Sequence, residues 1–472
     1  MAKANDKWTS GSANSLAFYN MLGPIILNGV NFFTVPIFTR VLGPANFGVV
    51  SLYTTWVQLF TILIGLQTSG TIAPSMVHYD EDEEKRYLSS ILSLSLLSFG
   101  VLTLLAILFI KPLSAFTGFP VQIIVMMLLQ SFGAYMIGFG NIFFTYEKKA
   151  KLNFVLSVSV TILTIGLSLL LVLLVDKPET NYNGRITGMM LPNLALGVVL
   201  LVYFLRRGGS FYDKEYWKFC LPLSLPLIFH GLSQIILAHN AKVMLQQYTG
   251  DRVLVGVFSL VLTLTNILNV IYNALNNTWV PFFYDYMKTD DHEAIRRRGQ
   301  NYLLLFAIIC SGFMLLAPEM ILLFAGEEYR DGISLVPVLT LAAFFTFLYS
   351  FPVNYQFFHR KTTNIAIGTA MAAGMNVVLN VLLIKPLGMM GAALATTAAY
   401  LLLFLFHEWI ARHKIKGTYP MPFRLYIPVL ALVLAAAALS YLLLALAWPR
   451  WLFAIALAAW LLGRTLRNRT IF

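Results

Sequence analysis

Charged residues are scarce in this sequence of 472 residues: Asp, Glu, Lys and Arg make up 11% of it, whereas 58% of the residues are hydrophobic. A soluble domain of this length carries about a quarter charged residues. The scarcity of charge therefore excludes an ordinary soluble protein. Apolar runs of about 20 residues, the length that crosses a hydrocarbon core, recur along the chain. Composition alone thus predicts an all-α polytopic membrane protein.

Cysteine is nearly absent as well, since only Cys220 and Cys310 occur. Both fall at or within apolar segments, which indicates small buried residues rather than a disulfide or a metal site. The sequence also lacks a Gly-Lys dipeptide, so it has no phosphate-binding loop of the kind that ATP-driven transporters use. Residues 1–15 are polar and do not show the basic-then-apolar layout of a cleaved signal peptide, so we expect none.

Long loops on the expected outer side are missing too, the longest running roughly from residue 176 to 185. Polysaccharide polymerases and membrane glycosyltransferases usually need a sizeable external loop or an acidic catalytic cluster. His407 and Glu408 are followed by Ala411 where a zinc-protease signature requires a second histidine. We therefore expect a protein that is not an enzyme.

About 14 apolar segments have the length of a transmembrane helix. They lie near 15–38, 48–76, 88–110, 121–144, 152–175, 186–205, 218–241, 253–280, 301–324, 333–356, 364–384, 391–410, 425–446 and 450–466. The last two segments need not both cross the membrane. Trp448 and Pro449 leave little room for a turn, so 425–466 could instead form a re-entrant hairpin.

If both termini are inside, 24 of the 33 Lys and Arg residues fall into inner loops, and the other nine, Arg450 among them, fall into outer loops. Cytoplasmic loops carry an excess of basic residues. The pattern predicts an even number of helices, with the N- and C-termini cytoplasmic. The net charge of +12 then mainly reflects the membrane topology, and the basic loops can attract anionic lipid headgroups. We expect no nucleic-acid partner.

A short internal repeat divides the chain. Residues 48–52, GVVSL, recur as GVFSL at 256–260, and each copy precedes a long helix and a charged inner loop. Duplicated halves are a common transporter build, with the substrate path between them. We expect two pseudo-symmetric six-helix lobes around a central cavity, plus a C-terminal helix pair. The N-terminal lobe comprises 1–213, the C-terminal lobe 214–424, and the additional helix pair with its basic tail 425–472.

Polar side chains concentrate in four helices that are equivalent in the two halves, those expected at 15–38, 48–76, 218–241 and 253–280. Intramembrane polar groups are costly to leave unpaired, so their positions are informative. The alternative to a polar cavity is that each side chain hydrogen-bonds to a neighbouring helix. The candidate cavity-lining, substrate-binding residues are Asn28, Asn31, Arg40, Gln58, Thr68, Arg185, His230, Gln234, Asn240, Lys242, Asn266, Asn269 and Asn273.

His230 is the only ionisable side chain that helix lengths place near the membrane midplane. It could take a proton or donate to a phosphate or a sugar hydroxyl, or it could be a neutral core histidine that does neither. Arg40, Arg185 and Lys242 fall toward the outer end, where interfacial anchoring is the default. As cavity residues they would attract an anionic pyrophosphate.

Five segments, in their order along the chain, resemble Wzx-type polysaccharide flippases. They are 39–48 after the first helix, 230–244 in the seventh, 279–284 at the end of the eighth, and the turns 324–329 and 385–393. One position departs from that pattern. The family usually has an acidic residue directly before the basic one in the seventh helix, whereas here Ala241 precedes Lys242, so no ion-coupling role of that acid carries over.

The resemblance implies the multidrug/oligosaccharidyl-lipid/polysaccharide exporter fold and alternating access. It implies a flippase of the bacterial cytoplasmic membrane that moves undecaprenyl-pyrophosphate-linked oligosaccharides, the units of O-antigen or exopolysaccharide, from the inner to the outer leaflet. Partners would be that substrate, membrane lipids and polysaccharide polymerase machinery. No cofactor is implied, and coupling to H⁺ or Na⁺ stays open.

Three alternatives remain. A lipid II flippase has the same fold and also fourteen helices. A cation-coupled multidrug antiporter of the same fold would bind its cations through intramembrane carboxylates, and none is expected near the midplane. A membrane enzyme such as a polymerase would have shown a long outer loop or an acidic pair.

Overall fold

The computed structural model describes residues 10–175 and 177–468, without the side chains of 10–28, 31, 465, 467 and 468. Within these residues every regular element is a helix. In this described part of the chain, eleven helices are long and apolar enough to cross a membrane, by length and composition. The predicted class, an all-α multi-pass membrane protein, is therefore confirmed.

The chain folds into two compact units. Unit 1 contains Met1–Leu42 and Val49–Ile235, and unit 2 contains Gly43–Gly48 and Ile236–Phe472. The units are thus divided within a helix and not in the loop near residue 213. The predicted lobes 1–213 and 214–424, and the separate pair 425–472, stay predictions.

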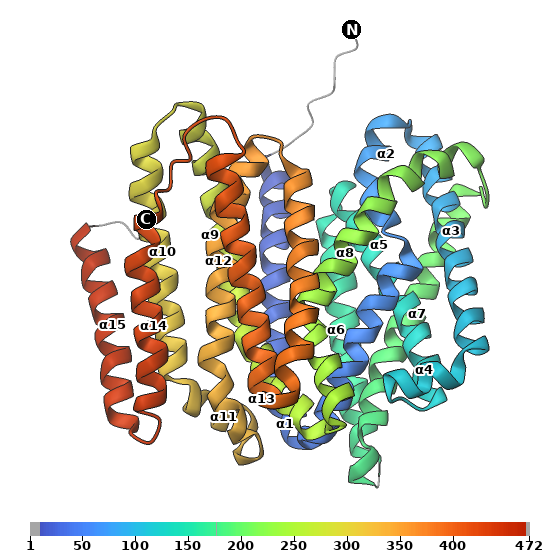
Figure 1. Ribbon diagram of the computed structural model, residues 1–472. Coiled ribbons are helices and arrows are strands. Elements are labelled where there is room, and N and C mark those ends of the chain that lie inside the picture. Colours follow the sequence, from blue (N-terminus) through green and yellow to red (C-terminus); the bar gives the residue numbers. More distant parts are fainter. Residues whose placement is uncertain (1–9, 176, 469–472) are drawn as a thin grey trace. The chain divides into compact units, whose positions relative to one another are not determined.

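Unit 1 is a bundle in which α7 packs against α3, α5 and α6 (Figure 1). Its helices are α1 (Ser10–Gly65, apart from 43–48), α2 (Ile72–His78), α3 (Glu81–Leu108), α4 (Ile110–Thr117), α5 (Val121–Tyr146), α6 (Ala150–Leu173), α7 (Tyr182–Gly208) and the first part of α8 (Lys214–Thr249). Cys220 is buried and free here, and Cys310 is buried and free in unit 2, as predicted.

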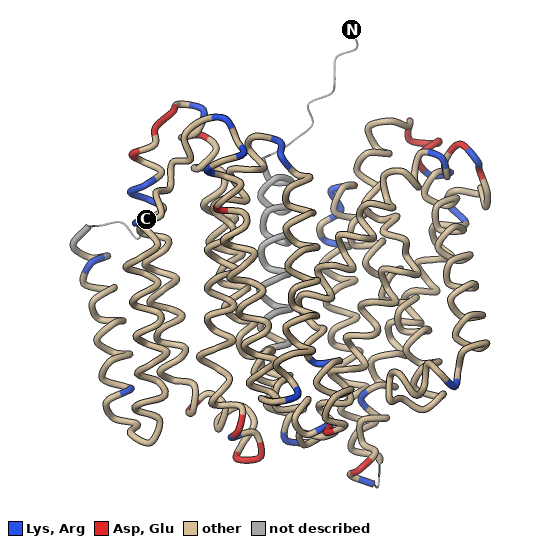
Figure 2. The backbone as a smooth tube through the Cα atoms, in the orientation of Figure 1, with Lys and Arg blue, Asp and Glu red and all other residues tan. Residues whose placement is uncertain are grey.

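Unit 2 has a core of aromatic and aliphatic side chains between α9, α10, α12, α13 and α14. Its helices are the rest of α8, α9 (Arg252–Lys288), α10 (His292–Leu315), α11 (Ala317–Ala325), α12 (Val336–Phe358), α13 (Thr362–His413), α14 (Tyr426–Leu442) and α15 (Ala447–Asn468). Figure 2 shows charged residues mainly near helix ends, with long uncharged stretches between them. That distribution is the one a bilayer requires.

Two of the long helices are really pairs. Gly43 in α1 has φ 67° and Gly388 in α13 has φ 54°, and both interrupt the helical backbone. Glycine adopts such positive φ values without the steric penalty that a Cβ imposes. Each kink falls between two helices that the sequence predicts separately.

The predicted continuous helix over 48–76 is wrong. α1 ends at Gly65, Leu66 and Gln67 take left-handed φ values of 47° and 53°, and a 3₁₀ turn follows. A Cβ on Gly65 would overlap the ring of Tyr135, and Thr68 Oγ1 lies 2.7 Å from Tyr135 Oη. Packing against α5 thus overrides the local helix preference.

The two segments of the predicted repeat meet at their glycines, within unit 2. A Cβ on Gly48 would come within 2.8 Å of Gly256 N, and one on Gly256 would overlap the carbonyl oxygen of Pro44. Only residues without a side chain allow this approach of two backbones. The contact explains why both segments begin with glycine.

The C-terminal helices α14 and α15 both lie along α10 (Figure 1). Their 17 and 22 residues span roughly 25 and 33 Å at 1.5 Å per residue. They are therefore two long antiparallel helices joined by a turn of four residues, 443–446.

Arg450 fixes the start of α15. Its side chain is 3% exposed, and the guanidinium donates to both carboxylate oxygens of Glu319 in α11, at 2.9 and 2.8 Å. It also donates to the carbonyls of Leu315, at 2.8 Å, and Leu443, at 3.1 Å. The sequence placed Arg450 in an outer loop, whereas burial beside an acidic partner makes it part of the core of unit 2.

We expect Glu319→Ala to lower the free energy of unfolding by about 3 kcal/mol, because it leaves a buried guanidinium without its counter-ion. Thermal unfolding in detergent measures this loss. The control is Glu327→Ala, because the Glu327–Arg330 pair is 69% exposed on both sides and such pairs contribute little. Equal melting temperatures for the two variants would show that the pair of Arg450 and Glu319 does not stabilise the fold.

Glu319 also gives stability a pH dependence of defined sign. Partial burial raises the pKa of Glu319, but hydrogen bonds from Arg450 and Trp451 outweigh it and hold the pKa below its usual value of 4.5. Such a carboxylate stabilises the fold above its unfolded-state pKa, and the stabilisation is lost as pH falls through the folded-state pKa. We expect the wild-type melting temperature to fall more steeply than that of Glu319→Gln as acid is added from pH 4.5. Melting temperatures of the wild type and Glu319→Gln that fall in parallel with pH would refute this role of Glu319.

Candidate functional site

Arg185 is the predicted site residue with the most distinctive setting in unit 1. It lies in the first turn of α7, and its guanidinium carbon is 3.7 Å from the centre of the Phe38 ring. Its Nη1 atom is buried without a hydrogen-bond partner among the described residues. One turn earlier, Asn181 Nδ2 donates to Val41 O over 2.9 Å. The start of α7 thus holds a cation with unused hydrogen-bonding capacity beside the end of the first helix.

The other predicted residues of unit 1 fall into two groups. Arg40, Gln58 and Gln234 are exposed and His230 is half-buried, so these four side chains can be reached from outside unit 1. Thr68 is instead fully buried and forms the hydrogen bond to Tyr135, which is an interhelical role. The predicted residues Asn28 and Asn31 lie outside the described side chains.

In unit 2 the predicted residues lie on α8 and α9. Lys242 is 6% exposed, and Asn240 donates to Met244 Sδ over 2.9 Å. Asn266 is exposed and accepts from Asn269 Nδ2 at 3.2 Å. Asn273 is exposed. Asn266 and Asn273 therefore present amide groups at the surface of this unit.

Asn276 continues the spacing of Asn266, Asn269 and Asn273 along α9, but its setting is different. It accepts a hydrogen bond of 2.8 Å from Nδ2 of the buried Asn354 in α12. Asn276 therefore hydrogen-bonds to a neighbouring helix, which is the alternative to lining a polar cavity.

A buried polar cluster near the end of α13 escaped the sequence analysis. His407 and Glu408 are 0% and 3% exposed. His407 Nδ1 lies 3.0 Å from Gln356 Nε2, and Arg412 Nε donates to Glu408 Oε1 over 2.9 Å. The available signal was the Glu-to-Arg spacing of four residues within an apolar helix, which favours an ion pair on one helix face.

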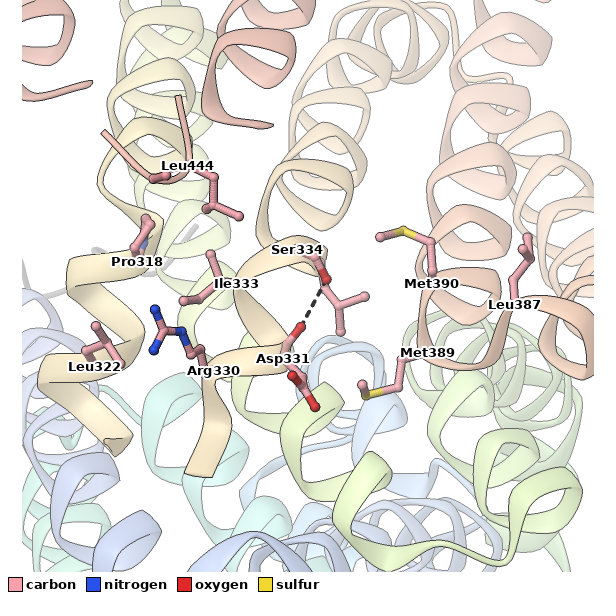
Figure 3. A pocket seen from close by; sticks show the side chains of 12 residues that line it. Pro318, Leu322, Arg330, Asp331, Ile333, Ser334, Leu387, Met389, Met390 and Leu444 are labelled. Atoms are coloured by element: carbon pink, nitrogen blue, oxygen red, sulfur yellow. Dashed lines mark hydrogen bonds between the residues drawn. The ribbon is translucent and has the colours of Figure 1, made fainter. Parts of the chain in front are cut away.

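An open pocket of about 630 Å³ lies in unit 2. Figure 3 shows Arg330, Asp331 and Ser334 of the 3₁₀ segment η3 (Glu327–Leu335) on one side, and Met389 and Met390 beside the α13 kink on the other. It contains none of the predicted site residues. No group of three or more His, Cys, Asp or Glu side chains in the described part of the chain could hold a metal ion.

Residues 16–287 match the family described as "Polysaccharide biosynthesis protein". An uncharacterized membrane protein of Haemophilus influenzae is 25% identical over 357 residues, which cover 73% of this chain and 84% of that protein. The family match includes both copies of the repeat and the candidate residues of α7, α8 and α9.

Solved structures share the fold. Lipid II flippase MurJ in an inward closed conformation has a TM-score of 0.66 at 13% identity, covering 96% of this chain and 99% of that one. An inward-facing multidrug resistance MATE family transporter of the MOP superfamily has 0.63 at 17% identity, covering 85% and 100%. A MATE transporter of Vibrio cholerae has 0.55 at 13% identity, covering 89% and 100%. The predicted exporter fold is therefore confirmed.

The two kinds of asparagine on α9 should separate by experiment. We expect Asn354→Ala to lower the free energy of unfolding by about 1 kcal/mol, because Asn276 loses its partner, and a double-mutant cycle with Asn276→Ala to give a coupling near 1 kcal/mol. The exposed Asn273→Ala is the matched control and should leave the melting temperature unchanged. Equal losses of unfolding free energy from Asn354→Ala and Asn273→Ala would show that the hydrogen bond between Asn354 and Asn276 contributes no more than an exposed amide.

Proposed function

We propose that this protein is a lipid-linked oligosaccharide flippase. The premise is that the chain belongs to the polysaccharide biosynthesis protein family. It carries undecaprenyl-pyrophosphate-linked repeat units of O-antigen or exopolysaccharide from the inner to the outer leaflet of the bacterial cytoplasmic membrane. It works by alternating access, with both termini cytoplasmic. The single observation that carries the proposal is the family match, and the fold it shares with flippases and transporters supports it.

The chemistry of the candidate residues suits such a substrate. Arginine pairs with phosphate oxygens through charge-assisted hydrogen bonds, and Arg185 has an Nη1 atom that needs an acceptor. The exposed amides of Gln58, Gln234, Asn266 and Asn273 can donate to and accept from sugar hydroxyls. A polyprenyl tail can meanwhile stay in the hydrocarbon.

Two other functions keep a specific observation in their favour. The similarity to lipid II flippase MurJ supports lipid II as substrate, which also carries a prenyl pyrophosphate. The buried carboxylate of Glu408, which the sequence analysis did not foresee, supports a cation-coupled multidrug antiporter. Neither alternative draws support from the family description.

We expect Arg185→Ala to reduce transport of a fluorescent undecaprenyl-pyrophosphate oligosaccharide in liposomes that contain the purified chain. Loss of a hydrogen bond to a charged group weakens binding by roughly tenfold or more. Arg40→Ala and His230→Ala should also reduce transport if these side chains contact the substrate.

The control for these variants is Lys218→Ala. Lys218 is 59% exposed and paired with Glu215 on the same helix, so its loss should leave transport unchanged. Wild-type rates in Arg185→Ala, Arg40→Ala and His230→Ala would remove these residues from the substrate path. A wild type that does not move the sugar lipid at all would overturn the function itself.

A further inference from the structure

Glu408 is a buried acidic residue that the proposed transport path does not use. It lies in α13, five residues before the helix ends at His413, and only 5% of its side chain is exposed. The same part of α13 contributes Phe404, Ile410 and Ala411 to the apolar core of unit 2. An ionised carboxylate is expensive in such a place unless its oxygens are satisfied.

The pairing of Glu408 with Arg412 satisfies only one of its two oxygens. Arg412 Nε donates to Oε1 over 2.9 Å, and Nη2 donates to the same Oε1. Oε2 is buried and has no hydrogen-bond partner among the described residues. The Glu319 carboxylate provides the contrast, because Arg450 donates to each of its two oxygens.

One-sided pairing of this kind leaves room for a proton. A carboxylate accepts through both oxygens, whereas a carboxylic acid carries one O–H and keeps the other oxygen as an acceptor. A proton on Oε2 would remove the negative charge from the orphaned atom. Oε1 could keep its bonds from Arg412 at the same time, so the neutral acid fits the observed geometry.

The neighbours of Glu408 offer no second counter-charge among the described residues. Besides Arg412 on its own helix, the titratable groups that face it are Tyr419, from the segment after α13, and Tyr426, from α14. Their hydroxyls lie 3.1 Å from each other. From α10, Arg296 donates to the carbonyl of Pro420 instead.

His407, the adjacent titratable residue, faces a different environment. Its Nδ1 lies against the amide of Gln356 in α12, and its Nε2 is packed where a Cβ of Gly368 would be. The imidazole is thus held apart from the Glu408–Arg412 pair.

Arg412 connects the buried acid to the surroundings of unit 2. Its side chain is 28% exposed, and its Nη2 also donates to Met421 O over 2.7 Å. The guanidinium can therefore be hydrated while Glu408 stays buried. It also links the charge of Glu408 to the position of the segment that leads into α14.

We propose that Glu408 is a proton-binding site, with Oε2 as the atom that takes the proton. Binding converts the carboxylate into a carboxylic acid, and the pair with Arg412 changes from net neutral to a single positive charge. Oε1 keeps the hydrogen bonds from Arg412, but the attraction between opposite charges is lost, so the protonated pair is held less tightly. The role of this site in driving a flippase rests on the proposed function. The binding of a proton at Glu408 does not.

Infrared difference spectra of the full chain in lipid nanodiscs, recorded over a pH series, test the site without transport. The C=O band of a protonated carboxylic acid is separate from the bands of carboxylates. We expect a carboxylic acid band in the wild type that grows as pH falls and that is lost in Glu408→Gln. Glu319→Gln is the matched control above pH 4.5, where Glu319 stays a carboxylate because Arg450 donates to both of its oxygens, and it should keep the band.

A full set of wild-type bands in Glu408→Gln would overturn the proposal. If Glu408→Gln does not fold, as judged by its melting curve, Glu408→Asp replaces it. The acid is then kept but moved, so its band must shift, and an unshifted band overturns the proposal equally.

A transport measurement then separates this proposal from the proposed function. An imposed proton gradient should change the rate of sugar-lipid transport by the wild type, and Glu408→Gln should lose that response. A wild type that shows the infrared band but moves no sugar lipid would refute the flippase and leave the proton site standing. A gradient response that survives in Glu408→Gln would refute the coupling role of Glu408.

Discussion

The structure depends on one constraint, which is the cost of leaving a polar group unpaired in hydrocarbon. Helices meet that cost for the backbone, because each amide bonds within its own segment. Buried side chains meet it in pairs, such as Arg450 with Glu319 and Asn354 with Asn276. Some buried polar atoms have no hydrogen-bond partner among the described residues, Glu84 Oε1 and Trp279 Nε1 among them.

Two such exceptions give the molecule its functional interest. Arg185 in unit 1 is a cation with an unsatisfied donor, and Glu408 in unit 2 is an acid with an unsatisfied acceptor. The first suits an anionic substrate, and the second suits a proton. Buried groups with unused hydrogen-bonding capacity are expected where a transporter exchanges ligands, because the missing partner arrives with the ligand.

Much of the fold could be predicted from the sequence, because apolar run length and the glycines at 43 and 388 act locally. The break at Leu66 and Gln67 could not, since it depends on Tyr135 in another helix. Arg450 was placed in a loop because its partner Glu319 lies 131 positions away. For the candidate site, sequence reasoning selected Arg185 and Asn273, but the hydrogen bond of Asn276 to α12 is not visible in the pattern of a single helix. It also missed Glu408, whose titratable neighbours Tyr419 and Tyr426 come from two other segments.

The most direct test of the flippase assignment is a comparison of substrates for the unmodified protein. Liposomes containing only this chain, without ATP, would receive an undecaprenyl-pyrophosphate oligosaccharide, lipid II or a cationic dye. The assignment predicts that the oligosaccharide lipid crosses the bilayer faster than lipid II and that the dye is not moved. Movement of the dye under a proton gradient, with the oligosaccharide lipid left in place, would contradict it.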